Sequence, residues 1–539
     1  MSADPTAGLT APLQVIARFR DHDFTLHDFL RARVEAQPDG TALEFEGRAW
    51  SYGQLDGLVA RWAGWLAAKG VAAGDTLAVM AQNDPNTVAL LFAAARLGAI
   101  LVPVNPDYGV PEARYVLDHA QVRGVVVSPD RQPVAEEALE AVPNAQGSPA
   151  WVAPLGAALE AEIAAAAPWT AGRGDADDCC LIIYTSGTTG FPKGAMHGQR
   201  GFVLTAEAFV ERLWLQPDER VMCVMPMFHV NALMYSVGGG LACGGTIVLV
   251  RRFSASGFWR TVAETRSTEV NLVAAAGSIL VQRPRSEFVP GHGLAKMFVA
   301  PQTRAMVDSL RDELEVPLLI ECYGMTEIPG VISNPFAGPH ILGTMGVLCR
   351  HPDPRIERPR ARIVDEDGQD VPPGTTGELL VRTPTVMQGY YRDPGQTEAA
   401  FQNGWFRTGD LVRLGEDGFY RFVARKKDII RRRGENVASA EVERTIAECA
   451  GVADVAVIGV PSPLGEEDIL AAVVPAPGAP HDAAAIIAWT RARLSAPKVP
   501  RYVAFVDAIP LTPTHKPAKH RLREDPTLMQ RAIDMATPA

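Results

Sequence analysis

The segment of the sequence best suited to chemistry is a run of hydroxyl and glycine residues, YTSGTTGFPKG, at positions 184–194. Glycine exposes backbone N–H groups, hydroxyls can donate hydrogen bonds to phosphate oxygens, and a lysine adds a positive charge. The residues with these properties are Thr185, Ser186, Gly187, Thr188, Thr189, Gly190 and Lys193. An apolar strand precedes the run and Pro-Lys-Gly ends it, features that a flexible linker would not need. We therefore predict a loop that binds a polyphosphate.

Four further segments follow this loop. They are PMFHVNA (226–232), YGMTE (323–327), WFRTGD (405–410) with RKKD (425–428), and PLTPTHKPAK (510–519). The loop lacks the G-x-x-x-x-G-K spacing of the common P-loop. Together, the five segments resemble the motifs of the acyl-adenylate-forming superfamily, which includes acyl-CoA synthetases, nonribosomal adenylation domains and beetle luciferases. The resemblance covers nearly the whole chain, and through 226–262 it is greatest to the crotonobetaine/carnitine–CoA ligase-like branch.

The resemblance assigns nucleotide-binding roles to the segment YGMTE. Tyr323, Gly324 and Met325 would lie against the adenine. Thr326 would bind the α-phosphate, and Glu327 would hold magnesium. The charges agree with this assignment, since a carboxylate beside the phosphates of ATP would be repelled without a divalent cation. Taken alone, the segment would read as a strand followed by a turn.

Further nucleotide contacts are implied by the same resemblance. Asp410 would accept hydrogen bonds from both ribose hydroxyls, and Arg425 would contact the ribose. Ala300 and Pro301 would lie against the adenine, in a segment where Val299 replaces the usual glycine. An aspartate after Thr-Gly is otherwise a common turn residue. The ribose-binding role of Asp410 therefore rests on its place in the order of the family's motifs.

The resemblance places the catalytic lysine at Lys516. Counting from Thr512 puts Lys516 at the catalytic position and Lys519 at the basic position that follows it. The segment departs from the family pattern at two places, because His515 replaces glycine and Pro517 replaces a β-branched residue. Lys519 is therefore the competing candidate. Without the family order, a basic run near a C-terminus would be read as a solvated tail.

A basic cluster precedes the last part of the chain. Lys427 occupies the family's hinge position, and Ala424 stands where the family has glycine. Gly434 and Glu435 resemble the loop that approaches the pantetheine arm of CoA when the small domain rotates. The alternative is that residues 425–433 form only a charged surface between domains.

The acyl pocket is the least specified part of the site. The residues that the resemblance places there are His229, Val230, Asn231 and Tyr235, with Ala276 and Gly277 from a run of small residues at 274–278. Such a run either leaves volume for an acyl chain or packs tightly. The PMFH segment has no aspartate at the position where amino-acid-activating relatives pair with the substrate ammonium, which counts against a nonribosomal adenylation domain.

The implied enzyme is an AMP-forming acid–thiol ligase that uses ATP, Mg²⁺ and CoA. It would convert a carboxylic acid to acyl-AMP with release of pyrophosphate, and then transfer the acyl group to CoA. Three alternatives stay open. They are an enzyme that loads a carrier-protein phosphopantetheine, a luciferase-like oxygenase, and a non-catalytic nucleotide-binding protein. The last is disfavoured because Lys193, Glu327, Asp410 and Lys516 are all present.

The elements that must position these residues alternate between short apolar runs and helix-like segments. The apolar runs lie at 77–80, 100–104, 124–128, 181–184, 246–250 and 317–324, and the amphipathic stretches include 52–69 and 258–266. This alternation predicts parallel sheets covered by helices, and from about Gly343 closely spaced strands predict an antiparallel or barrel-like module. With the resemblance, we expect an α/β chain. Its large N-terminal domain (1–426) would hold two doubly wound α/β subdomains and a β-barrel-like subdomain, and its small mobile C-terminal domain (427–539) would be α+β.

Composition narrows the remaining classes. The chain has 539 residues with 47% apolar and 21% charged side chains, typical of a multidomain globular protein. Its net charge of −11 disfavours nucleic acid as a partner, and its seven cysteines show no C-x-x-C pair, as expected for reduced thiols in a cytoplasmic protein. The most apolar stretch, 87–104, carries Arg96, so we predict a core helix that leads into a buried strand and no integral membrane segment. A homodimer stays open.

Overall fold

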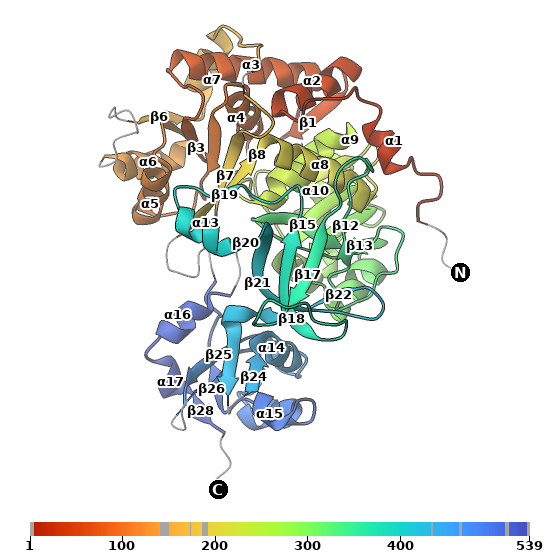
Figure 1. Cartoon of the computed structure of the whole chain (residues 1–539), viewed down its shortest axis with the longest axis vertical. Helices are drawn as coiled ribbons and strands as arrows, with labels where there is room; N and C mark the ends of the chain where they lie inside the picture. The colour runs from red at the N-terminus through yellow and green to blue at the C-terminus, as the bar shows by residue number, and fades with distance from the viewer. Residues whose placement is uncertain are drawn as a thin grey trace. The chain divides into compact units, whose positions relative to one another are not determined.

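The computed structural model describes residues 5–140, 150–172, 174–185, 192–432, 435–462, 466–511 and 517–535. The chain divides into two compact units (Figure 1). The first comprises Met1–Arg360 with Arg382–Phe406, and the second comprises Ala361–Val381 with Arg407–Ala539. The expected domain boundary at 426 and 427 falls inside the second unit. That a hinge lies at this boundary stays a prediction.

The first unit contains two seven-stranded sheets, each with a parallel core. In the first sheet the strand order is β13-β12-β11-β9-β10-β1-β2, and only β1 and β2 pair antiparallel. The bounds are β13 (Leu318–Ile320), β12 (Lys296–Ala300), β11 (Glu269–Val273), β9 (Arg220–Cys223), β10 (Thr246–Leu249), β1 (Thr41–Phe45) and β2 (Arg48–Ser51). The second sheet has the order β19-β8-β7-β4-β3-β5-β6. Its strands are β19 (Gly389–Tyr390), β8 (Lys193–Gly198), β7 (Cys179–Thr185), β4 (Ile100–Pro103), β3 (Thr76–Met80), β5 (Gly124–Val127) and β6 (Trp151–Pro154).

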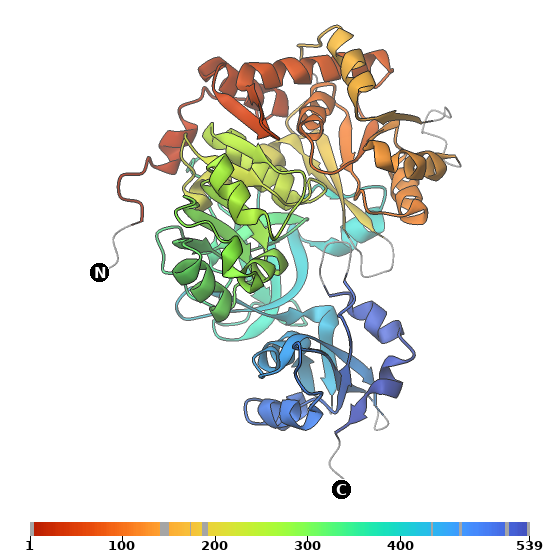
Figure 2. The ribbon, with the colours of Figure 1, turned by 180° about the vertical axis from the view of Figure 1, so that it is seen from behind.

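Helices cover these strands, as the two views in Figures 1 and 2 show. The helices of the first unit are α1 (Pro12–Ile16), α2 (Leu26–Ala36), α3 (Tyr52–Ala68), α4 (Pro85–Arg96), α5 (Val110–Ala120), α6 (Gln132–Leu139), α7 (Ala157–Ala165), α8 (Gln199–Leu213), α9 (Gly239–Cys243), α10 (Phe258–Thr265), α11 (Ala274–Gln282), α12 (Arg304–Asp308) and α13 (Pro394–Ala400). The expectation of an α/β fold is confirmed. The apolar runs became strands because both of their faces are buried beneath helices.

The stretch 87–104 forms the buried helix and strand that we expected. Asp84 caps α4 by accepting a hydrogen bond from the backbone N–H of Asn86 at 2.9 Å, and Pro85 begins the helix. Arg96 at the other end is only 1% exposed, and its guanidinium lies 2.5 Å from the Asp56 carboxylate. The ion pair explains how a charge is tolerated in a core helix.

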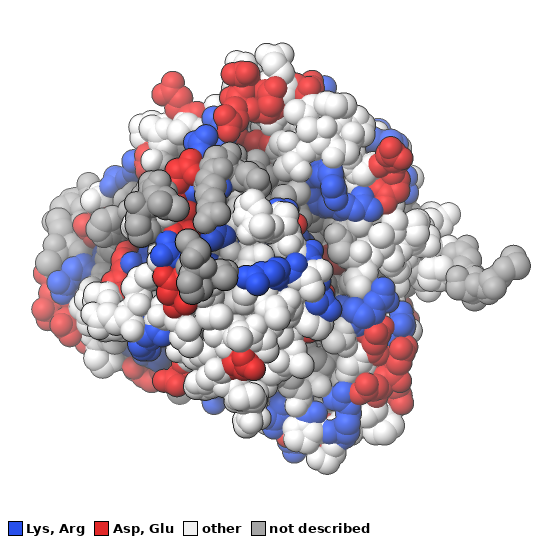
Figure 3. Space-filling view, turned by 90° about the horizontal axis from the view of Figure 1, so that it is seen from below, with Lys and Arg blue, Asp and Glu red and all other residues white. Residues whose placement is uncertain are grey.

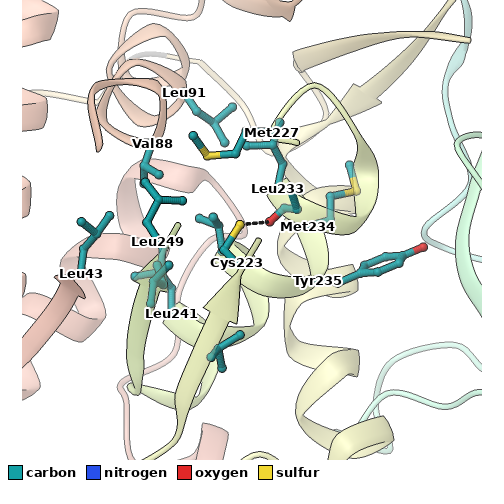
Figure 4. Close-up of a cluster of buried hydrophobic side chains, with 14 of the residues drawn as sticks. Leu43, Val88, Leu91, Cys223, Met227, Leu233, Met234, Tyr235, Leu241 and Leu249 are labelled. Carbon is teal, nitrogen blue, oxygen red and sulfur yellow. Dashed lines mark hydrogen bonds between the residues drawn. The ribbon is translucent and has the colours of Figure 1, made fainter. Parts of the chain in front are cut away.

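One apolar core joins the two sheets of the first unit. Figure 4 shows Val88 and Leu91 of α4 among side chains from β1, β9 and β10. The same cluster includes Leu233 and Met234 of the π-helical segment Asn231–Gly238, while Tyr235 points away from the aliphatic side chains. The core therefore fixes the position of this segment, which carries expected acyl-pocket residues.

Closely spaced antiparallel strands occur in the later part of the chain, as predicted. In the first unit, β14 (Cys322–Met325), β15 (Ile328–Ser333) and β16 (Val347–Leu348) form a small antiparallel sheet. A five-stranded sheet contains β17 (Arg360–Val364), β18 (Thr376–Arg382), β20 (Phe401–Gln402), β21 (Trp405–Leu414) and β22 (Tyr420–Arg425), and β21 pairs antiparallel with both β20 and β22.

The C-terminal part of the second unit is α+β. Its elements are β23 (Ile429–Arg432), β24 (Glu435–Ala438), α14 (Ser439–Ala447), β25 (Val452–Pro461), β26 (Glu467–Pro475), α15 (Ala483–Arg491), β27 (Tyr502–Phe505), α16 (Lys519–Glu524), α17 (Leu528–Arg531) and β28 (Ile533–Asp534). Alternate residues of β25 enter two different clusters, with Val455 and Val457 in one and Ala456 and Ile458 in the other. The sheet is therefore buried on both faces.

All seven cysteines lie in the described residues and are free thiols, most of them buried. Among the described helices, none is both long enough and apolar enough to cross a membrane. On the face seen in Figure 3, basic and acidic side chains are interspersed.

Candidate active site

The antiparallel hairpin of β7 and β8 carries both ends of the predicted phosphate loop. Thr185 at the end of β7 is the register partner of Lys193 at the start of β8. The Thr185 hydroxyl donates to the Lys193 carbonyl at 3.5 Å. The loop residues Ser186, Gly187, Thr188, Thr189 and Gly190 lie outside the described residues. The hairpin therefore fixes where the loop begins and ends.

Lys193 lies beside a short segment that sequence reasoning did not single out. Strand β19 extends the sheet beyond β8, with Tyr390 opposite Ala195. The Lys193 ammonium lies 5.2 Å from the centroid of the Tyr390 ring and donates a hydrogen bond to the Gln396 side-chain oxygen. A pocket of about 280 Å³ opens here, lined by residues that include His119, Lys193, Tyr390, Asp393 and Gln396. The predicted phosphate-binding lysine thus faces a cavity.

Glu327 meets the same tyrosine from another direction. The Tyr390 hydroxyl donates to Glu327 Oε1 at 2.8 Å, and the Glu327 side chain is largely buried. Burial, and then the neighbouring Glu327 carboxylate, raise the pKa of Tyr390, so the phenol keeps its proton and remains a donor. The Glu327 carbonyl also accepts a hydrogen bond from the Met387 backbone at 2.8 Å. The structure therefore brings Lys193 to the ring of Tyr390 and Glu327 to its hydroxyl.

The hairpin of β14 and β15 presents the YGMTE segment. Tyr323, Gly324 and Met325 lie in β14, and Thr326 and Glu327 form the connection to β15. A side-chain carbon on Gly324 would lie 2.4 Å from the backbone nitrogen of Gly330. Only glycine fits at position 324, since the two backbones approach too closely for a larger residue.

His197 is a second residue that the sequence did not reveal. It lies in β8 and is 1% exposed, its ring is near the Thr326 backbone, and its Nε2 makes no hydrogen bond among the described residues. Burial lowers the pKa of His197 to about 4, and the nearby Thr326 backbone opposes this shift only in part. The histidine is therefore neutral near pH 7, and it brings the phosphate-loop hairpin close to the predicted α-phosphate residue.

The expected adenine segment ends strand β12. Ala300 is the register partner of Val273, Pro301 follows it, and β12 packs against β14. The backbone N–H of Gln302 donates to Glu321 Oε1 at 3.2 Å, directly before β14 begins. Glu321 is 6% exposed, and burial raises its pKa to about 7. Glu321 thus couples the two segments expected to enclose the adenine.

The expected acyl-pocket residues lie on two elements. His229 and Val230 precede the π-helical segment, which starts at Asn231, and the side-chain oxygen of Asn231 is buried without a hydrogen-bond partner among the described residues. Tyr235 is stacked on Phe209 of α8, with ring centroids 4.1 Å apart. π-Helical turns often occur at functional sites because they shift side chains out of the regular helical register.

Ala276 and Gly277 lie on the buried side of α11. A side-chain carbon on Gly277 would lie 3.1 Å from Met306 Sδ and 3.2 Å from Val299 Cγ2. At Gly277, therefore, the small residue allows tight packing, which is one of the two alternatives that its sequence left open.

Asp410 and Arg425 belong to the second unit, where they are register partners on β21 and β22. The Arg425 side chain lies 3.5 Å from Asp410 Oδ1, and Asp410 is 3% exposed. Lys427 lies in a short 3₁₀ turn, Lys426–Asp428, and Glu435 begins β24. Gly434 and Lys516 lie outside the described residues.

Lys519, the competing lysine, is held by its own unit. Its ammonium donates to the Ser439 hydroxyl at 2.8 Å and lies 2.7 Å from the Glu443 carboxylate, both on α14. These contacts give Lys519 a structural role at the start of α16.

The chain is similar to known proteins over most of its length. Residues 30–391 match the model of the AMP-binding enzyme family, and residues 441–516 match that of the AMP-binding enzyme C-terminal domain. The chain belongs to the AMP-binding enzyme family. The resemblance to acyl-adenylate-forming enzymes is thereby confirmed.

Relatives align over almost their whole length. The chain is 33% identical to the indoleacetate–CoA ligase of Aromatoleum aromaticum over 512 residues, covering 93% of this chain and 98% of the relative. It is 30% identical to the crotonobetaine/carnitine–CoA ligase of Proteus mirabilis, covering 91% and 97%. Among solved structures, ATP-bound MatB from Rhodopseudomonas palustris shares 29% identity with a TM-score of 0.81, covering 93% and 99%. The expectation of a large N-terminal and a small C-terminal domain is confirmed by such structures.

Glu321 generates a prediction about pH. Its pKa in the folded protein, about 7, lies above the ordinary value of 4.5. The stability it contributes is therefore fully present below pH 4.5 and is lost as the pH rises through 7. Glu321→Gln removes this titration, so the variant should gain on the order of 2–3 kcal/mol in unfolding free energy relative to wild type between pH 5 and pH 8.

Denaturant unfolding at several pH values measures this gain. Glu264→Gln, on an exposed position of α10, is the matched control and should track the wild type at every pH. A constant difference between Glu321→Gln and wild type across this range would show that Glu321 does not titrate there.

Proposed function

We propose that the protein activates a carboxylic acid as an acyl-adenylate with ATP, releases pyrophosphate, and then transfers the acyl group to CoA to give acyl-CoA and AMP. The observation that carries this proposal is the convergence of Lys193 and Glu327 on Tyr390 beside a pocket, directly after the hydroxyl-rich loop. Membership in the AMP-binding enzyme family, with CoA ligases among its relatives, supports the same reaction.

In the first step a carboxylate oxygen attacks the α-phosphorus of ATP. The new oxygen–phosphorus bond forms as the bond from the α-phosphorus to the bridging oxygen breaks, and pyrophosphate leaves with that electron pair. The carboxylate is already ionised, so no general base is needed. Lys193 would stabilise the departing phosphates, and Lys516 would offset the charge that builds at the carboxylate and the α-phosphate.

We propose Tyr323, Gly324, Met325, Ala300 and Pro301 as the adenine-binding surface. Thr326, which lies near the His197 ring, would bind the α-phosphate. Asp410 and Arg425 would bind the ribose. The residues 185–190 of the loop would bind the β- and γ-phosphates through backbone N–H groups and hydroxyls.

We propose Glu327 as the protein ligand for Mg²⁺. The fit is supported by the chemistry of the site, since Mg²⁺ binds proteins through one or two carboxylates together with phosphates and waters. The Tyr390 hydroxyl donates a hydrogen bond to Oε1 of Glu327, so Oε2 would be the atom that binds the ion. When bound, the ion would neutralise phosphate charge. Tyr390 would then be a positioning residue that orients the carboxylate.

For the second step, we propose that the small C-terminal domain (427–539), which carries Lys516, rotates at Lys427 and brings residues around Gly434 and Glu435 to the pantetheine arm of CoA. The CoA sulfur would attack the acyl carbon, and AMP would leave with the oxygen that had bridged it to that carbon. His229, Val230, Asn231, Tyr235 and Ala276 would line the acyl group. The domain boundary that this motion requires is 426 and 427.

A panel of carboxylic acids tests the proposed function. Pyrophosphate release is measured with ATP, with and without CoA, and the thioester product is identified by mass spectrometry. A carrier-protein phosphopantetheine as the alternative acceptor separates CoA ligation from carrier loading. Pyrophosphate release by none of the acids would contradict the proposal.

Lys516 and Lys519 give a matched pair of variants. Lys516→Ala should lower acyl-adenylate formation by about 100-fold or more, because the loss of a positive charge at the transition state is worth roughly 3 kcal/mol or more. It should leave thioester formation from supplied acyl-AMP largely intact. Lys519→Ala should reduce thermal stability and retain adenylation, since Lys519 contacts Ser439 and Glu443.

Both half-reactions are measured by pyrophosphate release and by thioester formation from synthetic acyl-AMP. The opposite result, with adenylation lost in Lys519→Ala and retained in Lys516→Ala, would assign the catalytic role to Lys519.

Lys427 allows the two steps to be separated. A hinge changes its backbone dihedral angles, whereas proline fixes φ near −65° and removes a backbone N–H. Lys427→Pro should therefore retain adenylation and lose most CoA transfer, while Lys427→Ala should retain both. Normal CoA transfer by the proline variant would move the pivot elsewhere, and equal loss of both steps would indicate general damage.

A further inference from the structure

Arg212 near the end of α8 is a buried arginine with no acidic partner among the described residues. Its residue is 6% exposed, and its Nε and Nη1 atoms make no hydrogen bond within the described part of the chain. Its guanidinium lies 4.9 Å from the centroid of the Phe209 ring. No carboxylate forms an ion pair with it among the described residues. Glu211, the residue before Arg212, forms its ion pair with the exposed Arg350 at 2.6 Å.

The other buried arginines in the described residues are all paired. Arg33 lies 3.3 Å from Glu207, Arg96 lies 2.5 Å from Asp56, and Arg432 lies 3.1 Å from Asp468. This pairing is expected, because a guanidinium keeps its charge in proteins and burying it without a counter-charge is unfavourable. Arg212 departs from this pattern. Its missing counter-charge points to a ligand.

The position of Arg212 links it to the proposed acyl site. Phe209, on which the guanidinium lies, is stacked on Tyr235 of the π-helical segment with centroids 4.1 Å apart. A side-chain carbon on Gly330 would lie 3.1 Å from Arg212 Nη1. The absence of a side chain at Gly330 therefore lets the guanidinium pack directly against the backbone of β15.

Gly330 also sets the distance to the reacting end of the substrate. It follows Glu327 by three residues, so the two positions are at most roughly 10 Å apart, the span of three fully extended residues. The guanidinium, which packs against Gly330, therefore lies within reach of a short acyl chain from Thr326 and Glu327, where the carboxylate is activated in the proposed function.

We propose that Arg212 binds a second carboxylate at the far end of the acyl substrate, so that the protein prefers dicarboxylic acids. A planar guanidinium can hold a carboxylate by two parallel hydrogen bonds, through Nε with Nη2 or through Nη1 with Nη2, and Nε and Nη1 of Arg212 both lack a partner among the described residues. The bound carboxylate supplies the counter-charge that the described residues lack. This inference rests on the proposed function for the identity of the ligand as an acyl substrate.

The experiment compares diacids from succinic to suberic acid with monocarboxylic acids of equal chain length. Pyrophosphate release by the wild type should show a KM at least about tenfold lower for the best diacid, since a hydrogen bond to a charged group is worth this factor or more. Arg212→Met should raise the KM for that diacid about tenfold and change the KM for the monoacid little. Arg212→Lys, which keeps the charge without the fork, should fall between them and serves as the test if the methionine variant does not fold.

Arg350→Met is the matched control, because it removes an exposed arginine, paired with Glu211 on the same helix as Arg212, and should leave the preference unchanged. Equal KM values for diacids and monoacids in the wild type would overturn the proposal, and so would an equal effect of Arg212→Met on both.

A binding measurement separates this proposal from the proposed function. Without nucleotide, the best diacid should raise the thermal unfolding temperature of the wild type and of Arg350→Met, but not that of Arg212→Met. Stabilisation without any pyrophosphate release would contradict the proposed function and retain the Arg212 site. Pyrophosphate release with no diacid preference and no Arg212-dependent stabilisation would do the reverse.

Discussion

The hydrogen bond from the Tyr390 hydroxyl to Glu327 Oε1 is the interaction on which the site depends. It joins strand β19 to the connection between β14 and β15, while the ring of the same tyrosine lies beside the Lys193 ammonium of β8. Three segments that are far apart in the sequence therefore share one aromatic side chain. A buried carboxylate that lost this donor would need another partner, because an unsatisfied buried charge is unfavourable.

The surrounding fold holds this interaction from both sides. Strands β7, β8 and β19 form an antiparallel extension of a parallel sheet, which places the phosphate-loop hairpin at its edge. His197, in β8 of the same hairpin, is buried near the Thr326 backbone. The lysine, the carboxylate and the tyrosine thus rest on strands whose own positions are fixed by buried apolar packing. Such rigid support is what a site needs to hold groups in a reactive geometry.

Local sequence patterns predicted the elements and the motif residues, but not the pairings between them. The run at 181–184 predicted a buried strand by its apolar character, and the glycines, hydroxyls and lysine after it predicted phosphate binding. The sequence around Tyr390 shows no such pattern. The place of Tyr390 in the site depends on the register of β19 with β8, which the sequence of either strand alone does not predict.

The same reason explains the other residues that were missed. Glu321 and Arg212 look like ordinary charged positions until their burial is known, and each depends on contacts from elements distant in the chain. The small residues at 274–278 are compatible either with free volume for an acyl chain or with tight packing. At Gly277 the close neighbours Met306 and Val299 show tight packing. Periodicity predicts which face of an element is buried, whereas the identity of the opposing side chain requires the fold.

The most direct test of this organisation is ATP–pyrophosphate exchange by Tyr390→Phe, measured as a function of magnesium concentration. Tyr391→Phe, one residue along and without a bond to Glu327, is the control. If Tyr390 orients Glu327 in the nucleotide site, Tyr390→Phe should lower exchange about tenfold or more and require more magnesium for half of its maximal rate, because a hydrogen bond to a charged group is lost. Tyr391→Phe should behave like the wild type. Wild-type exchange with unchanged magnesium dependence in a folded Tyr390→Phe variant would contradict this role.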